Sequence, residues 1–264
     1  MISFQGNRQI LKSAKLLETN SRNLYPHIST SRIRTQIGIE SPDPKFFSEM
    51  KKEYRSARQM IRESRDIYTA LINNLQFGRI GNCSEDSMLT ELLGKVNGQK
   101  NIYTGSLSID NGKEKGSLNH VVAFITNRPI RAGREEFFKN KDAIIIDTWL
   151  GVTDFAENYF TKLKSVYRKV FMYDKSKRFA TLSDDNPINE LIRLESKTVQ
   201  EYKARKKEYC PSTKISIVPF IDDSLNAEKI KNMKETFPEL ALKNFKKIVL
   251  PKKKQKTANT DKIA

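Results

Sequence analysis

Cysteine and histidine are both scarce in this chain of 264 residues, which has two of each. The two distant cysteines, Cys83 and Cys210, are too few for a disulfide framework and indicate a reducing compartment. The cysteines and histidines do not follow a spacing typical of metal ligands. The sequence therefore predicts no metal site, and it contains no motif that indicates a cofactor.

Long apolar runs are missing as well. Residues 1–17 lack the apolar core of a secretory signal, and no stretch reaches the roughly 18 apolar residues that a membrane-spanning helix needs. We therefore expect no membrane span and no signal-peptide route. If the protein is exported, a different route carries it.

Charge is abundant but unbalanced, because 48 lysine and arginine residues face 31 aspartate and glutamate residues, for a formal net charge of +17. A basic surface of this kind favours acidic proteins, anionic membranes or nucleic acid as partners. The sequence shows no RNA-binding signature, no zinc-finger spacing and no helix-turn-helix pattern. No specific nucleic-acid partner is therefore expected.

Changes in composition divide the chain into four predicted regions. Residues 1–42 are polar and are predicted to be an irregular appendage. Residues 43–180 are predicted to form a core domain, led by one amphipathic helix of about 30 residues over 47–75. Residues 181–247 are predicted to be a helical C-terminal region. Residues 248–264 are predicted to be a basic, disordered tail.

The core domain combines helical and strand patterns. A helix is predicted after Asn82, which stands at the capping position, and Gly98 marks its end. Three segments rich in β-branched and aromatic residues follow, over 101–109, 119–126 and 142–149. The sequence thus predicts an α+β fold with a small antiparallel sheet packed on helices and with helical flanking regions.

Three residues of this domain have a pattern typical of thiol chemistry. Cys83 begins the predicted helix, where unpaired backbone amides and the helix dipole stabilise a thiolate. His120 begins one predicted strand and Asp147 ends the next, so antiparallel pairing places the two opposite each other, with Cβ atoms about 4.5–5.5 Å apart. We predict Cys83 as the nucleophile, His120 as its base and Asp147 as the residue that orients the base.

The predicted register has a further consequence for the two strands. If His120 faces Asp147, then Val122 faces Ile145 and Phe124 faces Ala143. The register is self-consistent on sequence grounds. It makes the candidate triad a geometric prediction about two strands and one helix.

Other residues near the triad are candidates for supporting roles. An oxyanion needs a second donor besides the amide of Cys83, and Gln76 and Asn82 each carry an NH₂ group shortly before the nucleophile. Gln76 is equally well explained as the end of a helix, and Asn82 as a cap. Trp149 is either a wall of the site or an ordinary core residue.

The segments GNCSEDS, NHVVAFI and DAIIIDTWLG resemble the cores of bacterial effector proteins with a Cys-His-Asp triad. These are papain-like or transglutaminase-like enzymes of intracellular pathogens, and the RavJ-like effector domain has a similarly short interval between Cys and His. The resemblance covers roughly residues 76–151, and Cys83, His120 and Asp147 match the triad. Ser84 and Thr148 depart from the Gly and Pro that relatives often have.

The resemblance implies a secreted effector that reaches the host-cell cytosol and acts on a host protein by thiol acyl transfer. The reaction stays open between transglutaminase, glutamine deamidase and cysteine protease. The alternative is a non-catalytic basic adaptor that binds acidic partners or membrane surfaces.

Overall fold

The structure is a computed structural model. It describes residues 4–25, 27–28, 66–77, 80–81, 83–110, 115–159, 161–162, 214–220 and 225–251, together with residues 52, 56, 59, 63 and 64.

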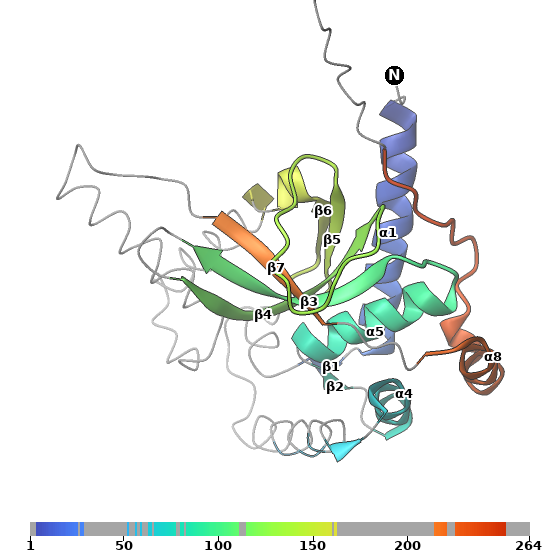
Figure 1. The fold of residues 1–264 in the computed structure, drawn as a ribbon. Helices are drawn as coiled ribbons and strands as arrows, with labels where there is room; N and C mark the ends of the chain where they lie inside the picture. Colours follow the sequence, from blue (N-terminus) through green and yellow to red (C-terminus); the bar gives the residue numbers. More distant parts are fainter. Residues whose placement is uncertain are drawn as a thin grey trace, which may run out of the picture.

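A five-stranded antiparallel sheet forms the centre of this part of the chain (Figure 1), with strand order β6-β5-β4-β3-β7. Its strands are β3 (Ile102–Asp110), β4 (Lys115–Thr126), β5 (Ala143–Asp147), β6 (Val152–Phe155) and β7 (Lys214–Phe220). The three predicted strands correspond to β3, β4 and β5. The prediction of an α+β fold with a small antiparallel sheet is confirmed.

Helices cover one face of the sheet. Helix α5 (Cys83–Val96) contacts β3, β4 and β5, while α1 (Phe4–Leu24) contacts α5, β5 and β6. Helix α4 (Ile67–Phe77) packs on α5. The C-terminal part contributes α8 (Ala227–Thr236) and the short 3₁₀ helix η1 (Pro238–Leu240). Just before α5, β2 (Ile80–Gly81) pairs in parallel with β1 (His27–Ile28).

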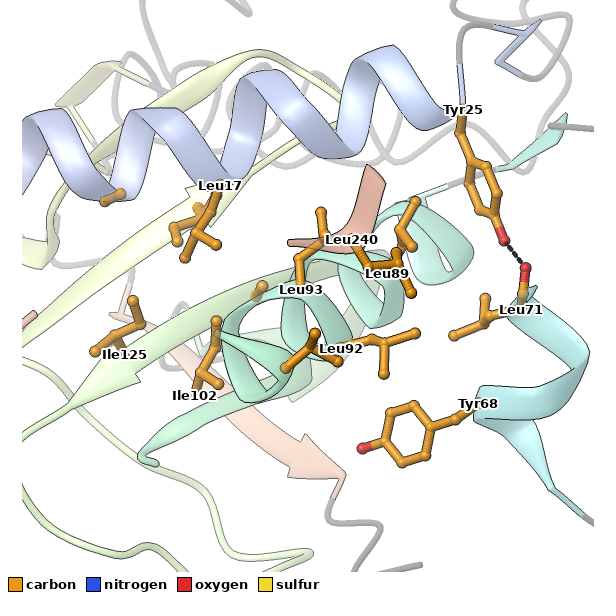
Figure 2. Packing of buried hydrophobic residues seen from close by; sticks show 14 of the residues in the cluster. Leu17, Tyr25, Tyr68, Leu71, Leu89, Leu92, Leu93, Ile102, Ile125 and Leu240 are labelled. Atoms are coloured by element: carbon orange, nitrogen blue, oxygen red, sulfur yellow. Dashed lines mark hydrogen bonds between the residues drawn. The ribbon is translucent and has the colours of Figure 1, made fainter. Parts of the chain in front are cut away.

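The main core lies between these helices and the sheet (Figure 2). Leu17 of α1, Leu93 of α5 and Ile125 of β4 are fully buried in it. A Cβ on Gly94 of α5 would lie 2.5 Å from the Ile102 side chain, so a glycine allows the helix to approach the sheet closely. The Tyr25 hydroxyl donates a 2.8 Å hydrogen bond to the carbonyl of Leu71 and links the end of α1 to α4.

A second apolar cluster covers the opposite face of the sheet. Its strand residues include Val122, Phe124 and Ile145, which alternate with the residues of the main core. The cluster also contains Ile130 of the β4–β5 connection and Tyr159, which follows β6. The central strands are therefore buried on both faces.

For residues 4–24 the prediction of an irregular segment is wrong. Residues 4–24 form the 21-residue helix α1, and Ala14 and Leu17 of that helix are fully buried. Helix α1 is therefore part of the core, whereas the sequence predicts an irregular appendage here. The weak propensity of the segment is overridden by tertiary packing.

The predicted single helix over 47–75 is also wrong, because Ser64 and Asp66 are not helical and α4 begins at Ile67. The carboxylate of Asp66 accepts hydrogen bonds from the amides of Tyr68 and Thr69, both at 3.2 Å. An aspartate in this position starts a new helix. Most of residues 47–65 lie outside the described part.

The C-terminal regions differ from the prediction at two places. Residues 214–220 lie in the predicted helical region but form β7 at the edge of the sheet. Ile248 and Leu250 fall in the predicted disordered tail, yet both are buried. The side-chain amide of Gln99 pairs with both backbone groups of Ile248, and that of Asn127 pairs with both of Leu250. Residues 163–213 and 252–264 lie outside the described part.

Within the described ranges, no helix combines the length and the apolar character needed to cross a membrane.

The role of α1 in the core gives a direct test. Leu17→Ala removes a fully buried side chain, so we expect the free energy of unfolding to fall by about 2–5 kcal/mol in urea titrations. Val249→Ala is the matched control, because Val249 is 66% exposed and its loss should change stability by less than about 0.5 kcal/mol. Equal, small effects for the two variants would contradict the packing of α1.

Candidate functional site

Cys83 is the first residue of α5, at the position that the sequence predicts. The amides of the first helical turn have no partner within the helix, so this end can stabilise negative charge. At the other end of α5, Gly98 follows the helix with a φ of 86°, and the sequence predicts the end of the helix at this glycine. The amide of Gln99 donates a hydrogen bond to the carbonyl of Gly94 there. Cys83 itself is only 6% exposed.

His120 and Asp147 form a direct hydrogen bond. The distance from His120 Nε2 to Asp147 Oδ2 is 2.7 Å, and both side chains are buried. His120 comes from β4, whereas Asp147 is the last residue of β5. The predicted contact between imidazole and carboxylate is therefore present.

The register that produces this contact differs from the prediction by two residues. Strand β4 pairs Phe124 with Ile145, whereas the predicted register paired Phe124 with Ala143. The pairing runs only as far as Ala123 with Ile146, so His120 lies beyond the position opposite Asp147. A shift of two residues keeps each side chain on its face, and a diagonal neighbour stays within reach of a long side chain.

Strand β4 is irregular where it carries His120. Against β3, the pairing passes from Ser106 with Val121 to Ser108 with Ser117, so β4 has more residues than its partner there. His120 lies within this bulged stretch. Bulges of this kind redirect side chains next to functional sites, and the alternating apolar pattern gives no sign of them.

Asp147 is held by two further groups. Its Oδ2 atom accepts a 2.8 Å hydrogen bond from the hydroxyl of Tyr159, and its Oδ1 atom accepts one of 2.9 Å from the amide of Leu150. The amide of Gly151, with φ of 71°, closes the turn on the Asp147 carbonyl at 2.8 Å. Burial and the nearby charge of Asp147 raise the pKa of Tyr159 well above its usual value, so this residue donates a proton throughout the neutral range. The sequence contains no signal that identifies Tyr159.

The pKa of His120 is raised to about 10. Burial alone lowers it, because a buried imidazolium loses its hydration. The negative charge of Asp147 and its hydrogen bond outweigh burial, and the side chain of Cys83 raises the pKa further. His120 therefore holds a proton well into the basic range.

The second ring nitrogen of His120 is the one available for proton exchange. Nδ1 is buried and makes no hydrogen bond of ordinary geometry within the described residues. The side chain of Cys83 contributes to the raised pKa of His120, so the thiol and the imidazole interact.

Trp149 packs against the imidazole. The two ring centroids are 5.5 Å apart with the planes at 58°, and Trp149 is buried. It therefore covers one side of the His120–Asp147 pair. Shielding from water strengthens an electrostatic interaction of this kind.

Of the two candidates for a second oxyanion donor, the structure describes only Gln76. Gln76 lies in the last turn of α4 with an exposed side chain, in contrast to the buried triad. Asn82 lies outside the described residues. Among the side chains that the structure describes, no group of three or more His, Cys, Asp or Glu residues could hold a metal ion.

The geometry brings a thiol at a helix N-terminus, an imidazole and a carboxylate together on an α+β fold. Such an arrangement can move a proton away from sulfur and stabilise the resulting charges. No protein-family model matches the chain, and neither a curated protein nor a solved structure is significantly similar to it.

The raised pKa of His120 is testable by NMR, because the chain has only two histidines and a His120→Gln variant assigns the signal. We expect His120 to titrate at about 10 in the wild type. In Asp147→Asn we expect the pKa to fall to about 6.5 or lower, because burial remains while the charge is gone.

The same shift sets a dependence of stability on pH. A histidine whose pKa is raised in the folded state contributes stability that is complete below about pH 6.5 and is lost as pH rises through about 10. The stability difference between wild type and Asp147→Asn should therefore shrink over this window. An unchanged His120 pKa in Asp147→Asn would contradict the assignment.

Proposed function

We propose that the protein is a cysteine-dependent acyl-transfer enzyme, with Cys83 as the nucleophile, His120 as its proton acceptor and Asp147 as the residue that orients His120. The observation that carries the proposal is the buried 2.7 Å hydrogen bond from His120 Nε2 to Asp147 Oδ2 beside a cysteine at a helix start. A structural histidine needs no such pair, whereas a thiol nucleophile needs an oriented base.

The proposed reaction follows from the two ring nitrogens. In the proposed reactive state the thiol proton is already on Nδ1 of His120, as the raised pKa of His120 favours, while Nε2 remains bonded to Asp147, whose charge stabilises the imidazolium. The sulfur then attacks a carbonyl carbon, and the oxyanion lies near the amides of the first turn of α5. The imidazolium gives its proton to the departing amine or ammonia, which leaves a thioester on Cys83.

The second half of the reaction releases the acyl group. Water attacks the thioester in hydrolysis or deamidation, and a primary amine attacks it in transamidation. His120 takes a proton from the attacking water or amine and returns it to the sulfur. All three reactions share the first half, so the triad supports the class of chemistry and leaves the acyl acceptor open.

We propose that the enzyme is papain-like or transglutaminase-like and that it resembles the RavJ-like effector domain. A nucleophile at the start of a central helix, with His and Asp from neighbouring antiparallel strands, supports this proposal. We further propose that the protein is a secreted effector that modifies a host protein in the host cytosol. The net charge of +17 favours a substrate or a binding surface that is acidic.

The proposal predicts a covalent change in a substrate that depends on Cys83. Host-cell lysate is incubated with the wild type and a labelled primary amine, and the proteins are analysed by mass spectrometry. Amine incorporation, deamidated glutamine or new peptide termini identify the three reactions. We expect the products to disappear in Cys83→Ala and to fall by a factor of about 10² or more in His120→Ala.

Cys210→Ala is the matched control, since it removes the other thiol of the chain and should keep full activity. Products that persist in Cys83→Ala would contradict the proposed nucleophile. A lysate that the wild type leaves unchanged would contradict the enzyme and favour a non-catalytic basic adaptor.

A further inference from the structure

Three residues of α5 share one face of the helix. Cys83, Ser87 and Thr90 are separated by four and three residues, the spacing that aligns side chains along a helix. All three are buried. The two hydroxyl groups therefore follow the thiol along the helix, one turn and two turns away.

Ser87 links this face to the strand that carries His120. Its hydroxyl donates a 2.9 Å hydrogen bond to the carbonyl of Val121, the residue next to His120. Val121 is also the first residue that pairs regularly with β3 after the irregular stretch of β4. Because the pairing with β5 ends at Ala123, this bond from α5 holds β4 two residues beyond the end of that ladder.

Thr90 links the same face to the turn that carries Asp147. Its Oγ1 atom lies 2.7 Å from Oγ1 of Thr148, which directly follows Asp147, and 2.9 Å from Oγ of Ser21 in α1. A third hydrogen bond, of 2.8 Å, reaches the carbonyl of Asp86. Since a carbonyl can only accept, Thr90 donates to Asp86, and its two acceptor positions are left for the hydroxyls of Ser21 and Thr148.

From these contacts we infer that Ser87 and Thr90 are positioning residues, which fix the nucleophile's helix against the His120 strand and the Asp147 turn. Neither residue reaches the reacting atoms. The inference rests on the proposed function, because it assigns the two hydroxyls the task of setting the distance from Cys83 to His120.

Helix α1 adds a second support to the same turn. Glu18 is buried and accepts hydrogen bonds from Lys15 at 2.6 Å and from the hydroxyl of Thr153 at 2.5 Å. Lys15 also donates to the carbonyl of Gly151 at 3.3 Å. The turn between β5 and β6 is thus held from α1 as well as from α5.

Substitutions that remove only the hydroxyl groups test this inference. Thr90→Val keeps the shape of the side chain, and Ser87→Ala removes a single oxygen. The control is Thr126→Val, since Thr126 is a buried threonine of β4 whose hydroxyl donates to the carbonyl of Arg128, two residues further along the chain. Two readouts are measured: the rate at which iodoacetamide alkylates Cys83, and the pKa of His120 by NMR.

We expect Ser87→Ala and Thr90→Val to lower the alkylation rate about tenfold to hundredfold, because a misplacement of about 1 Å costs that much in a positioned reaction. The pKa of His120 should fall in both, while Thr126→Val changes neither quantity. Thr90→Ser keeps the hydroxyl and should restore both. If Thr90→Val does not fold, as judged by circular dichroism, then Thr148→Val and Ser87→Ala are compared with Thr126→Val by the same two readouts.

Rates and a His120 pKa equal to those of the Thr126→Val control, in folded variants, would overturn the inference. Failure of the proposed function would give a different result in the alkylation experiment. If wild-type Cys83 does not react at all, the enzyme proposal fails, while the pKa of His120 still reports whether the two hydroxyls hold the strand and the turn.

Discussion

The buried hydrogen bond between His120 and Asp147 is the interaction on which the rest of the site depends. At 2.7 Å, it raises the pKa of the imidazole to about 10 even though burial opposes the charge. An ion pair that is removed from water is costly unless its remaining atoms are satisfied. Tyr159 and the amide of Leu150 satisfy the carboxylate, and Trp149 covers the imidazole.

The fold holds this pair from both faces of the sheet. On one face, α5 carries Cys83, and its hydroxyls bond to the β4 strand and the β5–β6 turn. On the other face, Tyr159 lies in the second apolar cluster and reaches Asp147. Helix α1, far away in the sequence, packs on α5 and on the same turn. The site is therefore a product of the whole described core.

Local patterns in the sequence were enough to predict α5, β3, β4 and β5, because caps, a terminal glycine and β-branched runs act over a few residues. The contact between His120 and Asp147 was predicted, but its register was wrong by two residues, because a shift of two keeps every side chain on its face and the alternating pattern fits both registers. Helix α1 and Tyr159 were missed for a related reason. Their roles come from contacts with residues distant in the sequence, which periodicity does not encode.

The activation of Cys83 by its neighbours is tested most directly by comparing the two thiols of one chain. Iodoacetamide is added near neutral pH, and peptide mass spectrometry follows the alkylation of Cys83 and Cys210 over time. We expect Cys83 to react faster than Cys210, and the advantage to disappear in His120→Gln. Labelling of Cys210 while Cys83 stays inert, or an unchanged rate at Cys83 in His120→Gln, would contradict a nucleophile activated by the His120–Asp147 pair.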